Sequence, residues 1–254
     1  HHYRRHRRRH RHHHLRHSHR HRPHRQRSLS IGSLVSEASA RRSFAFTNFR
    51  IGEVRGWRRA FSQANWVNVH HGWGSVAHGD VAALAMVEAE GSHVSYVALL
   101  DVDADGLSSF FERETGYHIR ATPFVRRAPD GSVAESGSAL MCTACADDAE
   151  ADALWAPDGA MARHCPGSDY VSYWMRRSLR PLWPERGSLP PLLPSLGYLH
   201  LCAAAHRRAG LLEHFLDSTL LNDGVTTLRE YCTHATSGGR TLLRAVGESE
   251  SESE

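Results

Sequence analysis

The chain lacks lysine, has few cysteines and contains no long hydrophobic run. All 31 of its lysine-or-arginine residues are arginine, which we attribute to a bias in the coding sequence rather than to function. A membrane-spanning helix needs roughly 18 or more consecutive apolar residues, and a secretory signal needs an apolar segment near its start. The sequence has neither, so it predicts no transmembrane span and no secretory signal. Five cysteines leave one odd, and a secreted disulfide scaffold is not expected.

Positive charge is concentrated in a head of low sequence complexity, residues 1–27. This head holds 11 arginines and no acidic residue, which leaves 20 arginines against 27 acidic residues and a net charge of −7 for the rest of the chain. Such a segment cannot bury apolar surface, and we predict that it is disordered. It could bind nucleic acid non-specifically by counterion release, chelate metal through its histidines, or have no selected function.

The two ends of the chain differ in charge. The acid-free, arginine- and serine-rich head also fits an organelle transit segment; without that role, the chain is expected to be cytoplasmic. Residues 247–254 form an acidic tail that should be solvated and disordered. Between the two ends, a composition that is 41% hydrophobic over the whole chain allows a real core. We therefore predict one folded domain at residues 28–246.

Strand-like segments precede helix-like segments along this domain. The strands have β-branched and aromatic residues between turn signals, and the last helix opens with a Thr227-x-x-Glu230 capping box. This order predicts an α+β fold, with a mixed sheet or barrel and a C-terminal helical extension at about 168–235. The predicted strands are residues 44–49, 52–61, 82–90, 95–102, 117–126 and 138–143, with a glycine- and histidine-rich loop at 72–79, and the predicted helices are residues 169–179, 195–209, 211–217 and 227–232.

The segment 103–117, read DADGLSSFFERETGY, places a carboxylate where a solvated one is not expected. Written as a helix capped by its first residue, it carries Leu107, Phe110 and Phe111 on one apolar face. Glu114 is the next position of that face. Desolvation raises the pKa of a buried carboxylate, as general acid/base catalysis near neutral pH requires. Glu114 is therefore a candidate catalytic residue, although a glutamate at a helix end can also reach solvent without such a role.

An ordered set of short motifs extends over residues 30–232. Together, and in this order, the motifs resemble those of the γ-glutamylcyclotransferase family, whose members carry a YGSL-type loop, a VxGxxR strand and a glutamate at a helix end. No single motif is decisive, and the order carries the resemblance. The motifs read IGSL at 31–34, VRGWRR at 54–59, FERETGY at 111–117, GYLHLC at 197–202, FLDST at 215–219 and TTLREY at 226–231.

The resemblance implies an α+β fold of the γ-glutamylcyclotransferase type and a small-molecule γ-glutamyl substrate. In such a reaction the α-amino group of the substrate attacks its own γ-carbonyl and releases 5-oxoproline, without a metal, nucleotide or other cofactor. Glu114 would shuttle the proton. The loop of Ile31, Gly32, Ser33 and Leu34 would bind the substrate, and the backbone N–H groups of its last three residues would form an anion cradle.

The sequence departs from the family pattern around this loop. The family has tyrosine at the position of Ile31, and a hydrophobic strand where residues 21–30 read HRPHRQRSLS. Arginine and histidine are costly to bury, so we predict that the first strand is missing or poorly formed. The alternative to an enzyme is therefore a catalytically inactive member of the family that acts as a binding or structural module.

A calcium loop is a further alternative. Asp101, Asp103, Asp105, Gly106 and Glu112 match the D-x-D-x-D-G-x5-E spacing, in which carboxylates surround a glycine turn. The segment before this match is predicted to be a strand, whereas such loops follow a helix. Acidic residues at a helix start also stabilise the helix dipole without any metal, and we favour that interpretation.

Cysteine and histidine also form a candidate zinc set. Cys142 and Cys145 are spaced C-x2-C, and His164 and Cys165 follow downstream. These are ligand types that zinc prefers, but the spacing between the two pairs is not a standard one. Free thiols, a local disulfide and unrelated surface residues remain open alternatives.

A serine hydrolase is the last alternative. Ser33 lies in a Gly-Ser turn, and His70, His71 and His78 follow it in the sequence. The G-x-S-x-G elbow is absent, and no histidine can be assigned as a base from its spacing. The sequence therefore does not favour this chemistry.

Overall fold

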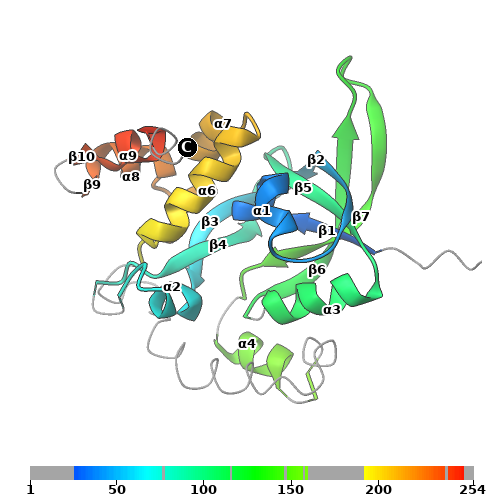
Figure 1. The fold of residues 1–254 in the computed structure, drawn as a ribbon, viewed down its shortest axis with the longest axis horizontal. Helices are drawn as coiled ribbons and strands as arrows, with labels where there is room; N and C mark the ends of the chain where they lie inside the picture. Colours follow the sequence, from blue (N-terminus) through cyan, green and yellow to red (C-terminus); the bar gives the residue numbers. More distant parts are fainter. Residues whose placement is uncertain are drawn as a thin grey trace, which may run out of the picture.

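The computed structural model describes residues 26–75, 78–114, 116–145, 148–156, 158–159, 192–237 and 240–248. In these ranges most strands come first and helices gather at the carboxyl end, which confirms the predicted α+β class (Figure 1). The strands of the main sheet are β1 Gln26–Ser30, β2 Thr47–Arg55, β3 Trp57–Ala64, β4 Ala82–Glu88, β5 Val94–Val102, β6 His118–Arg127, β7 Val133–Thr143 and β8 Leu220–Leu221.

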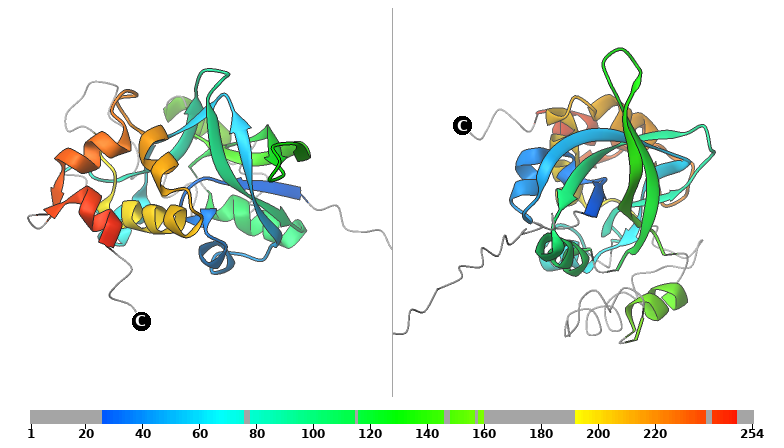
Figure 2. Two further views of the ribbon diagram at one scale, coloured as in Figure 1. Left: turned by 90° about the horizontal axis from the view of Figure 1, so that it is seen from above. Right: turned by 90° about the vertical axis from the view of Figure 1, so that its right-hand side faces the viewer.

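The main sheet is mixed and partly closed. Its strand order is β1-β5-β2-β6-β7-β4-β3-β8, and an additional parallel pairing of β1 with β7 closes the ring β1-β5-β2-β6-β7 into a barrel. Closure removes exposed strand edges from this part of the sheet. Residues of the barrel strands, of β3 and β4 and of the helices all contribute to the core. The β6–β7 hairpin extends beyond the barrel, as the right view of Figure 2 shows.

Helices cover the sheet and its loops. In Figure 1, α6 to α9 gather on one side of the barrel, while α3 lies near its other end. The helical elements are the 3-10 turn η1 Ser33–Val35, α1 Glu37–Arg41, α2 Trp66–His70, α3 Ala104–Arg113, α4 Asp148–Trp155, α6 Leu196–Arg208, α7 Leu212–Ser218, α8 Leu228–His234 and α9 Leu242–Glu248, and β9 Thr236–Ser237 pairs with β10 Arg240–Thr241.

The first strand is present, so the prediction that it is missing or poorly formed was wrong. β1 pairs with β5 along its whole length and with β7 at Ser28 and Leu29. Leu29 and the small Ser28 and Ser30 are the buried positions. Arg27 keeps its charged group at the surface, where its Nε lies 3.6 Å from Glu135. The strand therefore buries no arginine, and it includes the last two residues of the predicted head, 26 and 27; residues 1–25 lie outside the described ranges.

The turn of the first hairpin lies later in the sequence than predicted. A turn was expected at residues 50–51, between strands 44–49 and 52–61. The structure continues β2 through these positions and turns at Gly56, whose φ is +72°. Glycine adopts this left-handed conformation at little cost. Phe44 and Phe46 lie ahead of β2 and pack edge to face in the core, with ring centroids 6.0 Å apart.

The helix predicted after Asp103 is confirmed. α3 begins at Ala104, and the Asp103 carboxylate accepts the backbone N–H of Gly106 at 2.9 Å, as an N-cap does. Asp101 remains in β5 and pairs with Arg50 at 3.0 Å. The acids of the calcium pattern are thus spread over a strand, a cap and a helix instead of surrounding a loop. In the described ranges no group of three or more metal-binding residues occurs.

The C-terminal helices largely follow the prediction. α6, α7 and α8 begin and end within two residues of the expected bounds, and the Thr227–Glu230 capping box is formed. α9 was not predicted and extends two residues into the expected acidic tail. The predicted helix 169–179 lies outside the described residues. Among the helices that are described, none is long and apolar enough to cross a membrane.

The structure describes only the first half of the candidate zinc set. Cys142 lies next to the last residue of β7 and Cys145 follows the strand, and both are buried free thiols. The Cys145 thiol donates to the carbonyl of Gly116 at 3.9 Å. His164 and Cys165 lie outside the described residues. The described half of the set therefore consists of buried side chains in the core.

Candidate functional site

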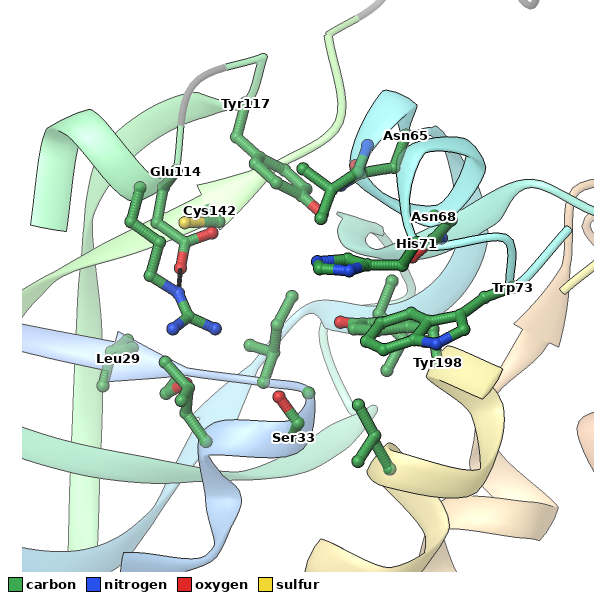
Figure 3. A pocket seen from close by; sticks show the side chains of 18 residues that line it. Leu29, Ser33, Asn65, Asn68, His71, Trp73, Glu114, Tyr117, Cys142 and Tyr198 are labelled. Carbon is green, nitrogen blue, oxygen red and sulfur yellow. Dashed lines mark hydrogen bonds and ion pairs between the residues drawn. The ribbon is translucent and has the colours of Figure 1, made fainter. Parts of the chain in front are cut away.

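A pocket of about 350 Å³ lies between the end of β1, η1, α2, the end of α3 and the start of α6 (Figure 3). All five residues that were predicted to bind or convert a γ-glutamyl substrate line this pocket. They are Glu114 and the loop of Ile31, Gly32, Ser33 and Leu34. Segments that are about 80 positions apart in the sequence thus meet at one cavity. Their roles in binding and catalysis stay predictions.

Glu114 reaches the pocket from the C-cap position of α3. Phe110 and Phe111 on the same helix are buried in the core, while Glu112 points to solvent. Only 16% of the Glu114 side chain is exposed, and its Oε1 accepts a hydrogen bond from Nε of Arg113 at 3.1 Å. The neighbouring guanidinium stabilises the negative charge of the carboxylate. Among the described lining residues, Glu114 is the only carboxylate.

Two buried groups next to Glu114 respond to its charge. Burial raises the pKa of Cys142 well above its usual value, and the Glu114 carboxylate adds to this effect by repulsion and by hydrogen bonding to the thiol. Burial also raises the pKa of Tyr117, again with help from Glu114. Both groups are therefore protonated near neutral pH and can donate hydrogen bonds.

The loop after β1 approaches α6 closely. Gly32 caps η1, and a side chain on it would collide with the hydroxyl of Tyr198 unless that side chain moved, so glycine allows this close approach. The sulfur of Cys202 accepts hydrogen bonds from the Tyr198 hydroxyl and from the backbone N–H of Ser33. Because the Ser33 N–H is directed at Cys202, the N–H groups of Gly32 and Leu34 remain as candidates for an anion cradle.

A buried arginine forms a hydrogen bond to the backbone of the same loop. Arg59 on β3 is completely buried, and its Nε donates to the backbone carbonyl of Ile31 at 2.9 Å. In the described structure its two terminal nitrogens have no hydrogen-bond partner. Burial lowers the pKa of Arg59 to about 10, which corresponds to a cost of about 3 kcal/mol for carrying the charge at neutral pH. Arg59 thus lowers the stability of the fold through its buried charge, while its hydrogen bond to Ile31 holds the pocket loop in position.

The sequence did not identify the side of the pocket opposite Glu114. In Figure 3, His71, Trp73 and Tyr198 face Glu114 across the cavity, and Asn65 lies near Tyr117. Trp73 belongs to the predicted glycine- and histidine-rich loop at 72–79, which gave it no role. His71 precedes this loop and was considered only as a base for the serine hydrolase, which its spacing did not support. Tyr198 is part of the GYLHLC motif, which was the one available signal, although no function was assigned to it.

Burial gives Tyr198 the same protonation state as Tyr117. It raises the pKa of Tyr198 well above the usual value, with further contributions from Cys202 and Tyr117. The pocket therefore combines one carboxylate with two protonated phenols and a tight backbone loop. This arrangement can move a proton and can donate hydrogen bonds to a developing negative charge.

Comparison with known proteins relates the chain to others by its fold. No family model and no curated protein matches the sequence. Among solved structures, a gamma-glutamyl cyclotransferase matches with a TM-score of 0.34 and 9% identity, over 60% of this chain and 98% of that protein. YkqA from Bacillus subtilis matches with a TM-score of 0.32 and 13% identity over 60% of this chain. The match spans 54% of the YkqA chain, and both likenesses concern the fold alone.

Proposed function

We propose that this protein is a γ-glutamylcyclotransferase-like enzyme that releases 5-oxoproline from a small-molecule γ-glutamyl substrate. The observation that carries the proposal is the meeting of Glu114 with the loop 31–34 in one pocket. Glu114 is the only carboxylate among the described lining residues, and the loop 31–34 lines the same cavity. We propose that backbone N–H groups of this loop form the anion cradle. A proton shuttle beside an anion cradle is what this cyclisation needs.

The reaction is intramolecular and consumes no water. The free α-amine attacks the γ-carbonyl carbon, and a new C–N bond closes the five-membered ring. Glu114 takes a proton from the attacking nitrogen and returns it to the leaving nitrogen as the old C–N bond breaks. The products, 5-oxoproline and an amine, together contain all atoms of the substrate.

The surrounding groups would stabilise the negative oxygen that forms during this attack. The backbone N–H groups of Gly32 and Leu34 are the proposed donors, and the protonated phenol of Tyr117 supplies a further hydrogen bond. Donors that are fixed before the reaction need no reorganisation during it. We infer that the hydrogen bond from Arg113 orients the Glu114 carboxylate for proton transfer.

The direct test is an assay for 5-oxoproline with the full chain. Glutathione, γ-glutamyl amino acids and γ-glutamyl amines should each be offered, and the product separated by chromatography. Release from at least one substrate class supports the proposal. Failure with all three classes would exclude the enzyme and favour an inactive binding or structural module. The inactive module remains a second candidate function because Ile31 replaces the tyrosine of the family loop.

Arg59 provides a second test, because it combines a cost in stability with a tether to the loop. Arg59→Met should lower 5-oxoproline turnover about tenfold or more, since a misplaced loop impairs catalysis. The same variant should unfold at a similar or higher urea concentration. Removal of the buried charge relieves about 3 kcal/mol, which offsets the roughly 1–3 kcal/mol lost when the Ile31 carbonyl is left unpaired.

Arg55→Met is the matched control, because Arg55 is exposed at the end of β2. It should change neither turnover nor the urea midpoint by much. If Arg59→Met instead lowers stability strongly and leaves turnover unchanged, Arg59 serves the fold and does not position the loop.

A further inference from the structure

The pocket has an apolar mouth that the proposed reaction does not explain. Among the described residues, four large hydrophobic side chains are exposed, and two of them, Val67 and Leu201, line this pocket. Their exposed fractions are 39% and 43%. Single exposed apolar residues are common on protein surfaces, but two that share the wall of one pocket indicate a surface for apolar contact.

Two helices hold this pair in place. Asn65 caps α2 by accepting the backbone N–H of Val67 at 2.8 Å. On α6, Leu201 follows Tyr198 by three residues and Gly197 by four, so the three share one face of the helix. Tyr198 and Leu201 both line the pocket. The two residues of the apolar mouth are therefore positioned by regular helices.

Trp73 adds a fixed aromatic surface next to this pair. The imidazole of His71 stacks on the indole, with ring centroids 4.6 Å apart and an interplanar angle of 24°. The backbone N–H of Trp73 donates to Asn68 at 2.9 Å, and its carbonyl accepts the Ser195 hydroxyl at 3.1 Å. A side chain on Gly197 would lie within 2.5 Å of the indole. Glycine at that position lets α6 support the ring directly.

The opposite end of the pocket is enclosed and carries the charge. Leu29 and Cys142 line it and are buried, and Glu114 lies there, across the cavity from Trp73 (Figure 3). Arg113 is the one arginine among the described lining residues, and it pairs with Glu114. The proposed ring closure takes place beside Glu114, so the γ-glutamyl group occupies the enclosed end. The leaving group then extends toward the mouth.

We propose that the mouth is a subsite for an apolar leaving group, so that the substrate is a γ-glutamyl amide of an uncharged aromatic or aliphatic amine. This inference rests on the proposed cyclotransferase function. Val67 and Leu201 contact the apolar atoms of the amine, and the His71–Trp73 ring pair packs beside its flat groups. A leaving group that ends in a carboxylate, as in γ-glutamylglycine, gains less, because the described part of the mouth has no arginine to pair with it.

The test compares kcat/KM for γ-glutamylbenzylamide and γ-glutamylglycine with the full chain. The benzylamide should be preferred about tenfold or more, the size of effect that apolar contacts give in enzyme pockets. In the double variant Val67→Ser, Leu201→Ser, this preference should fall to about threefold or less. The matched control is Val133→Ser, Val225→Ser, which changes the other two exposed valines and should keep the preference.

Binding to the Glu114→Gln protein separates failure of the subsite from failure of the proposed reaction. Calorimetry should show tighter binding of the benzylamide than of γ-glutamylglycine, and the Val67/Leu201 changes should remove the difference. If this holds but no 5-oxoproline is released by the unchanged protein, the subsite stands and the cyclotransferase does not. Equal or better use and binding of γ-glutamylglycine would overturn the subsite, as would a preference that survives the double variant. Absence of both release and binding would overturn both proposals.

Discussion

Glu114→Gln should release 5-oxoproline about a hundredfold or more slowly than the unchanged protein, while substrate binding and folding are retained. Glutamine has nearly the same shape, but its amide cannot accept and return a proton in the way a carboxylate does. Glu114 is partly buried at the end of α3. Among the described lining residues there is no other carboxylate that could replace it. Single-turnover rate constants and calorimetric binding would separate the chemical step from substrate affinity.

Glu112→Gln is the matched control for this experiment. Glu112 lies on the same helix two residues earlier, and its side chain is exposed. Its replacement should change turnover little, because it does not line the pocket. The proposed role of Glu114 fails if the two variants behave alike, or if Glu112→Gln is the one that loses activity.

The placement of Glu114 could be predicted because the signal is local. Leu107, Phe110 and Phe111 define the inward face of α3 by their spacing, and the Asp103 cap fixes where the helix begins. Helix periodicity needs no knowledge of the rest of the fold. The loop 31–34 was found through the order of its motif relative to later ones. The structure then brings both to one pocket, which no spacing along the chain could establish.

The rest of the site depends on contacts between distant segments. Arg59 was visible in the VRGWRR motif, but its burial beneath Ile31 follows from the packing of β3 against the loop. The position of Trp73 depends on its contacts with Ser195 and Gly197 at the start of α6, more than 120 residues later in the sequence. The prediction for the first strand was wrong because it rested on the average polarity of residues 21–30. A five-residue strand needs only Leu29 and two small serines on its buried positions.

The strand β1 leads to the second large effect that we expect. Deletion of residues 1–25 should leave the melting temperature nearly unchanged, because β1 begins at Gln26. Deletion of residues 1–30 should abolish cooperative melting. It removes the strand that joins β5 to β7, opens the barrel, and leaves two strand edges unpaired.

The magnitude of this second deletion follows from what β1 supplies. Burial of Leu29 contributes about 1.5–3 kcal/mol, and each buried backbone group of β5 and β7 left without a partner costs roughly 1–3 kcal/mol. Several such groups together reach the roughly 5–15 kcal/mol that stabilises a typical domain. Circular dichroism during thermal unfolding would measure both deletions. A cooperative transition that survives removal of residues 1–30 would show that the barrel closes without β1, and the loop 31–34 would then need another anchor, for which the hydrogen bond from Arg59 to Ile31 is the first candidate.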